Sequence, residues 1–447
     1  TTKSFDVLIV GSGAAGCVVA SYLAENSRAS IAVIEAGGKD SDPLIHIPAG
    51  FGTILAKDKH VWTHSTVAQH GTERRFRSGK VLGGGTSVNA MAYVRGQKRD
   101  FDAWDEATAG DGDWNHASMW RAFIEQEKND TFHDEHHGTQ GNLAVQLPKG
   151  INELNQYCLK AFQEYGLPYN PDYNGASQIG VSPVQSNIEN SRRCSAVVAH
   201  LRRHLESGRV TLLVNTTVTR VLIDSHRAVG VEILQGGTTQ QIQGKQVILS
   251  AGAVHSPKIL MHSGIGPKTQ LQEFGIEVMV DSPGVGENLH DHPIVPLSAY
   301  VKGNLGYQSV AQGLGTLKAG IRYILTKDGP AAGSGIETVS YWDPLNLQGD
   351  PTVQCYHVPI ISKDGLSPTG TRPGVTFELV VLQPKSRGWV RLADADPTSM
   401  PLINPNFIGH EYDLKVAVES VKAMRHVLTQ ESLAPVIDEE VSPGPSV

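Results

Sequence analysis

Three glycines and one acid near the N-terminus have the spacing of a nucleotide site. Gly11, Gly13 and Gly16 form the pattern GxGxxG, and Glu35 follows Gly16 by nineteen residues. In such a pattern the first glycine permits a tight turn, the second lets the backbone approach a pyrophosphate, and the third lets a helix pack closely on a strand. The start of that helix offers N–H groups and a favourable dipole to phosphates. Glu35 is placed to accept hydrogen bonds from a ribose hydroxyl, and it would repel the 2′-phosphate of NADP.

The segments around these residues predict a complete βαβ unit. Residues 5–10 are a continuous apolar run, which is typical of a parallel strand buried on both faces. Residues 15–23 have helical spacing with small side chains, and residues 31–34 are a second apolar run that ends at Glu35. The order of strand, glycines, helix, strand and acid predicts a dinucleotide site. From these residues alone, NAD and FAD both remain open.

A second group of glycines, Gly83 to Gly85, lies in the segment GKVLGGGTSVNAM at residues 79–91. A phosphate-binding P-loop would need a glycine at position 74 and a hydroxyl at position 81, which are Arg74 and Val81 here. A flexible linker is disfavoured because apolar residues such as Val88 and Met91 surround the glycines. Glycine is used where a ligand and the backbone approach too closely for a Cβ atom. The segment therefore predicts a backbone surface that lies against a flat cofactor.

The longer segment GKVLGGGTSVNAMAYVRGQKRDFDAW, residues 79–104, resembles the first signature of the glucose–methanol–choline (GMC) family of FAD-dependent alcohol oxidoreductases. The segment GAVHSPKILMHSGIG, residues 252–266, resembles the second signature, and further family-like stretches follow in order along nearly the whole chain. The resemblance implies a bound FAD. Some members attach FAD through a histidine near the first signature, and TSVNAM has none, so we expect FAD to be non-covalent.

The resemblance and the nucleotide pattern together give a set of expected cofactor-binding residues. The triple-glycine segment is expected to pass beside the isoalloxazine ring and the pyrophosphate, and Val218 is expected to meet the adenine through its backbone. The expected residues are Gly11, Gly13, Ala14, Ala15, Gly16, Glu35, Ala36, Gly79, Val81, Gly84, Gly85, Asn89, Ala90, Met91, Val218, Ser250, Ala251 and Gly252.

The expected fold class is α/β, with a doubly wound, Rossmann-like FAD-binding domain that is interrupted by a substrate domain containing an antiparallel sheet and helices. Residues 1–149 and 186–297 hold the cofactor motifs and form the expected FAD-binding domain. Residues 150–185 and 298–430 form the expected substrate-binding domain. Within it, TVQCYHVPII and VTFELVVLQP alternate in the manner of strands, and RGWVRL is expected to close a hairpin.

The resemblance implies oxidation of an alcohol by hydride transfer from its α-carbon to flavin N5, while a neutral histidine takes the hydroxyl proton. Family members have this histidine in a late segment that this sequence, ending in LAPVIDEEVSPGPSV, does not show. The catalytic residue is therefore unknown, and the C-terminal segment of the FAD-binding domain is expected to be missing. Three explanations stay open: an incomplete chain, a separate chain that supplies the segment, and a non-catalytic flavin binder.

The expected substrate is a small primary alcohol, aromatic or heteroaromatic, such as a benzylic, furan-type or pyridoxine-like compound, which becomes an aldehyde. The electron acceptor is oxygen or another molecule. A choline-type dehydrogenase is one alternative, disfavoured because no carboxylate or aromatic cage for an ammonium can be located in the sequence. A hydroxynitrile lyase or another non-redox flavoprotein on the same fold is the second alternative.

Composition excludes several other classes. The net charge of −7 disfavours nucleic-acid and anionic-membrane partners, and no apolar run has the ~18 residues of a membrane helix. Four widely spaced cysteines predict reduced thiols and, with no visible secretory signal, a cytoplasmic protein. His133, His136 and His137 lack the HExxH order, so we expect no metal site, and the family resemblance implies an exposed turn there.

Overall fold

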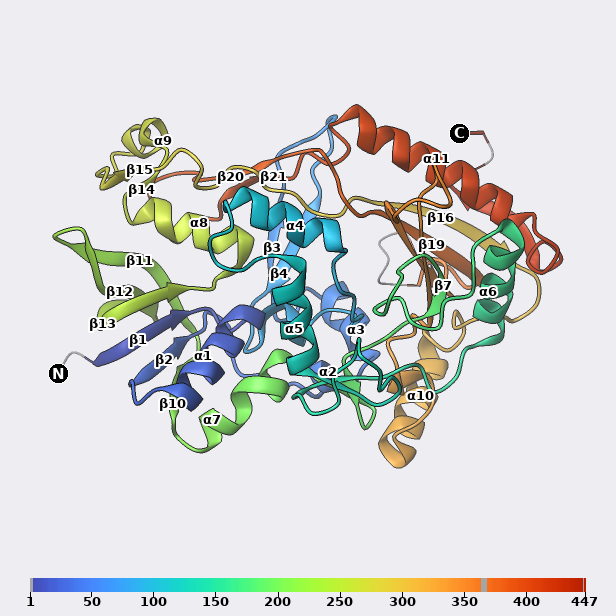
Figure 1. Cartoon of the computed structure of the whole chain (residues 1–447), viewed down its shortest axis with the longest axis horizontal. Coiled ribbons are helices and arrows are strands. Elements are labelled where there is room, and N and C mark those ends of the chain that lie inside the picture. The colour runs from blue at the N-terminus through green and yellow to red at the C-terminus, as the bar shows by residue number, and fades with distance from the viewer. Residues whose placement is uncertain (1–2, 363–367, 445) are drawn as a thin grey trace.

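The computed structural model describes residues 3–362, 368–444 and 446–447, and two six-stranded sheets dominate it (Figure 1). In the first sheet, the strand order is β10 (Val210–Leu213), β2 (Ile31–Ile34), β1 (Ser4–Val10), β13 (Thr238–Leu249), β12 (Arg227–Gln235) and β11 (Thr216–Asp224). Its first four strands are parallel, and β13, β12 and β11 form an antiparallel meander.

Helices cover both faces of this first sheet because residues 7–10 of its strand β1 present apolar side chains on both faces. Val7 and Ile9 of β1 pack with helix α1 (Ala14–Asn26), whereas Leu8 and Val10 pack in the cluster that contains Ile259 of helix α8 (Gly252–His262). Figure 1 shows α1 and α7 (Arg202–Glu206) on one side of the sheet and α8 on the other. The expected strand–helix–strand unit and the doubly wound arrangement are therefore confirmed.

The second sheet is antiparallel throughout. Its order is β22 (Ile437–Ser442), β16 (Ile294–Val301), β19 (Gly374–Val381), β18 (Val353–Val358), β17 (Thr338–Trp342) and β7 (Gly180–Pro183). One face packs against helices α6 (Glu153–Tyr165) and α11 (Glu411–Leu428) in the largest apolar core of the described residues. The expected strands in TVQCYHVPII and VTFELVVLQP are β18 and β19. The segment RGWVRL contains β20 (Trp389–Arg391), which pairs with β21 (Leu402–Asn404) outside the main sheet. The predicted domain limits remain predictions.

Three short elements lie near the nucleotide motif. Strands β3 (Val61–Ser65) and β4 (Arg75–Gly79) form a ladder, and β4 leads into the one-turn helix η1 (Gly84–Ser87), which contains two of the three consecutive glycines. The four cysteines are buried and unpaired. Within the described ranges, no helix is both long and apolar enough to cross a membrane.

Candidate cofactor site

A cavity of about 740 Å³ lies where β1, β2 and β13 end. In open α/β sheets, ligands bind outside the carboxyl ends of the parallel strands, and Val10, Ile34 and Leu249 at these ends all line the cavity. Thirteen of the eighteen expected cofactor residues share this cavity. They are Gly11, Gly13, Ala14, Ala15, Glu35, Ala36, Gly79, Gly84, Gly85, Val218, Ser250, Ala251 and Gly252.

The glycines of the nucleotide loop have three different structural roles. Gly11 has φ of +97°, and a Cβ atom there would lie 2.4 Å from the carbonyl oxygen of Ser250. A Cβ atom on Gly16 would lie 2.0 Å from the carbonyl oxygen of Gly11, so Gly16 permits the close packing of helix on strand. A Cβ atom on Gly13 would meet no protein atom within 4 Å and would occupy the cavity itself. Gly13 therefore keeps open a space that a ligand can fill.

The N-terminus of α1 faces the same cavity without a side-chain cap. Gly13 is its N-cap residue, and the first turn contains no acid. The first N–H groups of a thirteen-residue helix therefore point at the cavity, where they can bind phosphate oxygens. This geometry fits the diphosphate of a dinucleotide.

The triple-glycine segment lies beside the nucleotide loop in the cavity wall and packs directly on it. Gly83 has φ of +95° and Gly84 has φ of +53°, both in the left-handed region that favours glycine. A Cβ atom on Gly84 would lie 2.8 Å from the Cα atom of Gly13, whereas one on Gly85 would project into open space in the cavity. Two of the three glycines thus set a backbone turn and a contact between loops, and Gly85 alone leaves room for a ligand.

Glu35 lies at the end of β2, and both of its carboxylate oxygens have partners. Oε2 accepts hydrogen bonds from the Ser12 hydroxyl at 2.5 Å and the Ser12 N–H at 3.1 Å, and Oε1 accepts one from the Gly37 N–H at 2.8 Å. Burial raises the pKa of Glu35, and these hydrogen bonds oppose part of the rise. The carboxylate is thereby held in a fixed position at the cavity wall.

Five expected cofactor residues do not line this cavity. Gly16 lies in the helix–strand contact, and Val81 is fully buried against Ile45 and Ile54. Asn89 accepts a hydrogen bond from Arg193 Nη1 at 2.8 Å through its side-chain oxygen. Ala90 and Met91 belong to the apolar cluster around Phe51 and Ile188. Their role as cofactor residues remains a prediction.

Other lining residues were not among those expected from the sequence. Trp62 and Ser78 come from β3 and β4, and Thr398 comes from the loop between β20 and β21. His255 and Lys258 lie on α8, one turn apart and one turn beyond Gly252. That helical spacing within the second signature was the available signal for His255, because residues 252, 255 and 259 share one face of a helix.

Two histidines beside this cavity, His64 and His255, have lowered pKa values. Burial, with a smaller contribution from the nearby positive charge of Lys258, lowers the pKa of His64 to about 4 and that of His255 to about 3. Burial also lowers the pKa of Lys258 to about 8, and its ammonium donates a hydrogen bond to the Pro397 carbonyl at 2.8 Å. These histidines are therefore neutral at pH 7, so the cavity wall carries less positive charge than its composition suggests.

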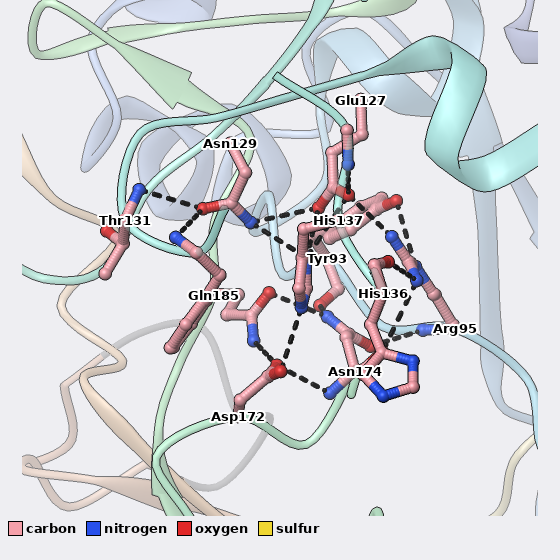
Figure 2. Close-up of polar contacts among 12 residues, drawn as sticks. Tyr93, Arg95, Glu127, Asn129, Thr131, His136, His137, Asp172, Asn174 and Gln185 are labelled. Carbon is pink, nitrogen blue, oxygen red and sulfur yellow. Dashed lines mark hydrogen bonds and ion pairs between the residues drawn. The ribbon is translucent and has the colours of Figure 1, made fainter. Parts of the chain in front are cut away.

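A buried ion network lies beside the first signature (Figure 2). His137 Nδ1 lies 3.2 Å from both carboxylate oxygens of Glu127, and its Nε2 lies 2.8 Å from Asp172 Oδ2. Burial disfavours a charged imidazole, but the hydrogen bonds to Asp172 and Glu127 outweigh it and raise the pKa of His137 to about 9. His137 is thus a buried imidazolium, which corrects the expectation of an exposed turn at this histidine.

Arg95 of the first signature completes this network. Its guanidinium donates to Glu127 Oε2 at 2.6 Å and to the His136 carbonyl at 2.7 Å, and it lies 4.7 Å from the Trp120 ring. Glu127 therefore forms ion pairs with both Arg95 and His137 (Figure 2). The network ties the irregular segment that follows the triple glycines to β5 (Glu127–Asn129).

The same histidine belongs to the one candidate metal grouping of the described residues, with Asp134 and Asp172. Its potential ligand atoms lie within 4.8 Å of one another. A metal ligand must offer an unprotonated ring nitrogen. Because both nitrogens of His137 donate to carboxylates, this grouping favours an ion pair over a metal site.

Two smaller cavities meet near the second sheet. The first, about 390 Å³, lies between helix α3 (Gly50–Ala56) and helix α10 (Gly313–Thr326) and has mainly apolar walls, with Lys57 as the one charged residue among its described lining. The second, about 410 Å³, is more polar and contains Glu337. Tyr307 lines both cavities, and its hydroxyl donates to Glu337 Oε1 at 2.5 Å.

The fold and the large cavity define a dinucleotide-binding α/β protein. Comparison with known proteins specifies the family: the N-terminal model of the GMC oxidoreductases matches residues 5–294, and the C-terminal model matches residues 384–447. The chain belongs to the GMC oxidoreductase family. It is an FAD-dependent oxidoreductase of CH–OH groups.

Named relatives within the family differ in substrate. The chain is 33% identical to an alcohol dehydrogenase [acceptor] of Pseudomonas putida and 35% identical to an oxygen-dependent choline dehydrogenase of Brucella anthropi, in each case over 99% of this chain and 81% of the relative. Among solved structures, pyridoxine 4-oxidase from Mesorbium loti has a TM-score of 0.86 at 26% identity, covering 98% of this chain and 83% of that one. A variant of formate oxidase from Aspergillus oryzae has a TM-score of 0.89 at 25% identity, covering 99% and 84%. These comparisons give no support to the expectation of a separate chain carrying a C-terminal segment.

Proposed function

We propose that this enzyme oxidises a small primary alcohol with an aromatic or heteroaromatic group to the corresponding aldehyde, using non-covalently bound FAD. The observation that supports this substrate class is the apolar cavity of about 390 Å³, whose walls include Phe51, Ile336 and Ile360. An aromatic or similarly apolar group gains free energy by leaving water for such a cavity. Pyridoxine 4-oxidase, a structural neighbour, acts on a heteroaromatic alcohol by its name.

In this proposal, the eighteen residues expected from the sequence are the FAD-binding set, with Gly13 and Gly85 leaving the room that the cofactor needs. The N–H groups at the start of α1 bind the diphosphate, and Glu35 orients the adenosine ribose. Bound FAD supplies the two-electron acceptor. The packing of Gly84 on Gly13 holds the two loops against each other at the cavity wall. No residue among those described is assigned here as the catalytic base.

A choline-type substrate is the second candidate, and Glu337 favours it. This carboxylate lies in the polar cavity next to the apolar one, and it accepts hydrogen bonds from Tyr307 and from the Asn152 side chain at 2.7 Å. A carboxylate beside an aromatic ring can attract a quaternary ammonium. The chain is also similar to choline dehydrogenases.

Anaerobic mixing of the oxidised holoenzyme with benzyl alcohol, pyridoxine and choline separates these candidates. The proposal expects loss of the oxidised-flavin absorbance with benzyl alcohol or pyridoxine, at a rate that E337Q leaves within about twofold. Bleaching by choline alone, lost in E337Q, would establish the second candidate. A flavin that stays oxidised with every alcohol would overturn both and indicate a lyase or another non-redox flavoprotein.

A further inference from the structure

Helix α10 presents a continuous apolar stripe to solvent. Five of its fourteen residues are large, apolar and about half to three-quarters exposed: Leu314 (74%), Leu317 (58%), Ile321 (48%), Ile324 (68%) and Leu325 (77%). At about 100° per residue, these five positions fall within an arc of about 100° on the helix surface. Single exposed apolar side chains need no explanation, but an aligned row on one helix indicates a surface that another body covers.

The opposite face of α10 is anchored in the protein, so the stripe is held in position. Tyr323 is 3% exposed, packs with Ala331 and Ala332, and donates its hydroxyl to the Ser191 carbonyl at 2.9 Å. Ala319 and Gly320 line the apolar cavity. In Figure 1, α10 lies at the lower right edge of the molecule, away from the nucleotide-binding sheet. The helix thus has the apolar cavity on one side and solvent on the other.

The charges of α10 are all positive. Lys318 and Arg322 flank the apolar stripe on one side, Lys327 is the C-cap residue, and residues 313–326 contain no acid. The nearest acid in sequence, Asp328, is paired with Arg322 at 2.7 Å. The whole chain has a net charge of −7, so this local charge is opposite to the average that predicted no anionic partner.

We propose that α10 lies on the surface of an anionic lipid bilayer, with its apolar stripe in the headgroup–acyl boundary and its cations at lipid phosphates. Leucine and isoleucine on one face and lysine and arginine on the flank are the composition of interfacial helices. Fourteen residues span about 21 Å, which is too short to cross the hydrocarbon core. A second copy of this chain fits less well, because an antiparallel pairing of two α10 helices would bring the same cationic flanks together.

This location also gives the proposed function a source of substrate, although the docking itself does not depend on that function. Because α10 lines the apolar cavity, a docked α10 places that cavity beside the lipid. Apolar alcohols concentrate in bilayers, so the cavity could receive them without their passing through bulk water.

The test is co-sedimentation of FAD-loaded enzyme with vesicles of phosphatidylethanolamine and phosphatidylglycerol, compared with vesicles of phosphatidylcholine alone. We expect binding to the anionic vesicles, a loss of binding at high salt, and a partition coefficient reduced roughly tenfold or more in L317Q/I324Q. K318E is expected to weaken binding to anionic vesicles and to leave binding to phosphatidylcholine unchanged. L414Q, at a position 53% exposed on α11, is the matched control and should bind as the parent does.

Two results would overturn the proposal. One is equal binding by the parent and L317Q/I324Q, provided that both retain the same FAD content and thermal midpoint. The other is an absence of vesicle binding together with a concentration-dependent dimer that L317Q/I324Q abolishes, which would assign the stripe to a second copy. Neither result depends on turnover of any alcohol. The vesicle test can therefore be interpreted even if the substrate proposal fails.

Discussion

Replacing His137 by glutamine should remove a pH-dependent part of the folding free energy. His137 donates to Glu127 and Asp172 from a fully buried position, and these bonds raise its pKa from 6.5 to about 9. A group with a raised folded pKa contributes stability that is fully present below its unfolded pKa and is lost as pH rises through the folded value. The window for His137 therefore runs from about pH 6.5 to about pH 9.

The size of the effect follows from the same shift. Each pKa unit corresponds to about 1.36 kcal/mol, so a rise from 6.5 to about 9 gives about 3 kcal/mol. Lys258 has the opposite sign: burial lowers its pKa to about 8, so its contribution to stability increases as pH rises from 8 toward its unfolded value. In the parent alone, the opposite pH dependences of His137 and Lys258 would partly cancel in the free energy of unfolding. The difference between parent and H137Q isolates His137, because Lys258 is present in both.

The assay is denaturant unfolding of parent and H137Q at pH 6, 7, 8, 9 and 10, followed by intrinsic fluorescence. We expect H137Q to be less stable by about 3 kcal/mol more at pH 6 than at pH 10. H290Q, at an exposed position, is the control and should show no such trend. A difference between parent and H137Q that stays constant from pH 6 to pH 10 would refute the argument that His137 is a buried imidazolium.

Three further predictions concern the cofactor site. G13V should weaken FAD binding at least tenfold in a flavin-fluorescence titration while the apoprotein keeps its thermal midpoint, because the new side chain enters the cavity and meets no protein atom at Cβ. G16A should instead lower the thermal midpoint itself, since its Cβ atom would lie 2.0 Å from the Gly11 carbonyl oxygen; G150A, where a Cβ meets nothing within 4 Å, is its control. Acid precipitation of the holoenzyme should leave the flavin in the supernatant, and a flavin that stays with the protein would show a covalent bond.

Local patterns in the sequence predicted the nucleotide-binding unit, because strand, turn and helix are adjacent in the chain. The apolar run of β1 is buried on alternate sides, and its pairing with β2 follows from the short crossover through α1. The partners of β16 could not be predicted in this way. This strand pairs with β19 and with β22, which lie about 80 and 140 residues further along the chain, and no local property of either strand encodes that choice.

Whether a side chain is buried or exposed was the property that the sequence did not reveal at these positions. The run HDEHHG is polar throughout, which is typical of an exposed turn, yet His137 is buried because Arg95, Glu127 and Asp172 form a network from three distant segments. The leucines of α10 present the converse case. Their helical spacing is compatible with a buried face, but their exposed side chains, together with the burial of Tyr323 on the opposite face, show that the apolar stripe points outward.

The two glycine motifs, separated by about seventy residues, form a single wall. The Leu82 N–H donates to the Gly38 carbonyl at 2.9 Å, and the Gly83 N–H donates to the Ser12 carbonyl at 3.0 Å. Gly84 then packs on Gly13, so the loop that receives the phosphates and the loop that faces the rest of the cofactor are held to each other by backbone. A side chain at Gly84 would therefore displace Gly13 as well. Of the three consecutive glycines, Gly85 is the one where an added Cβ atom would meet no protein atom within 4 Å. We therefore infer that the protein's own packing requires glycine at positions 83 and 84, whereas the cofactor requires it at position 85.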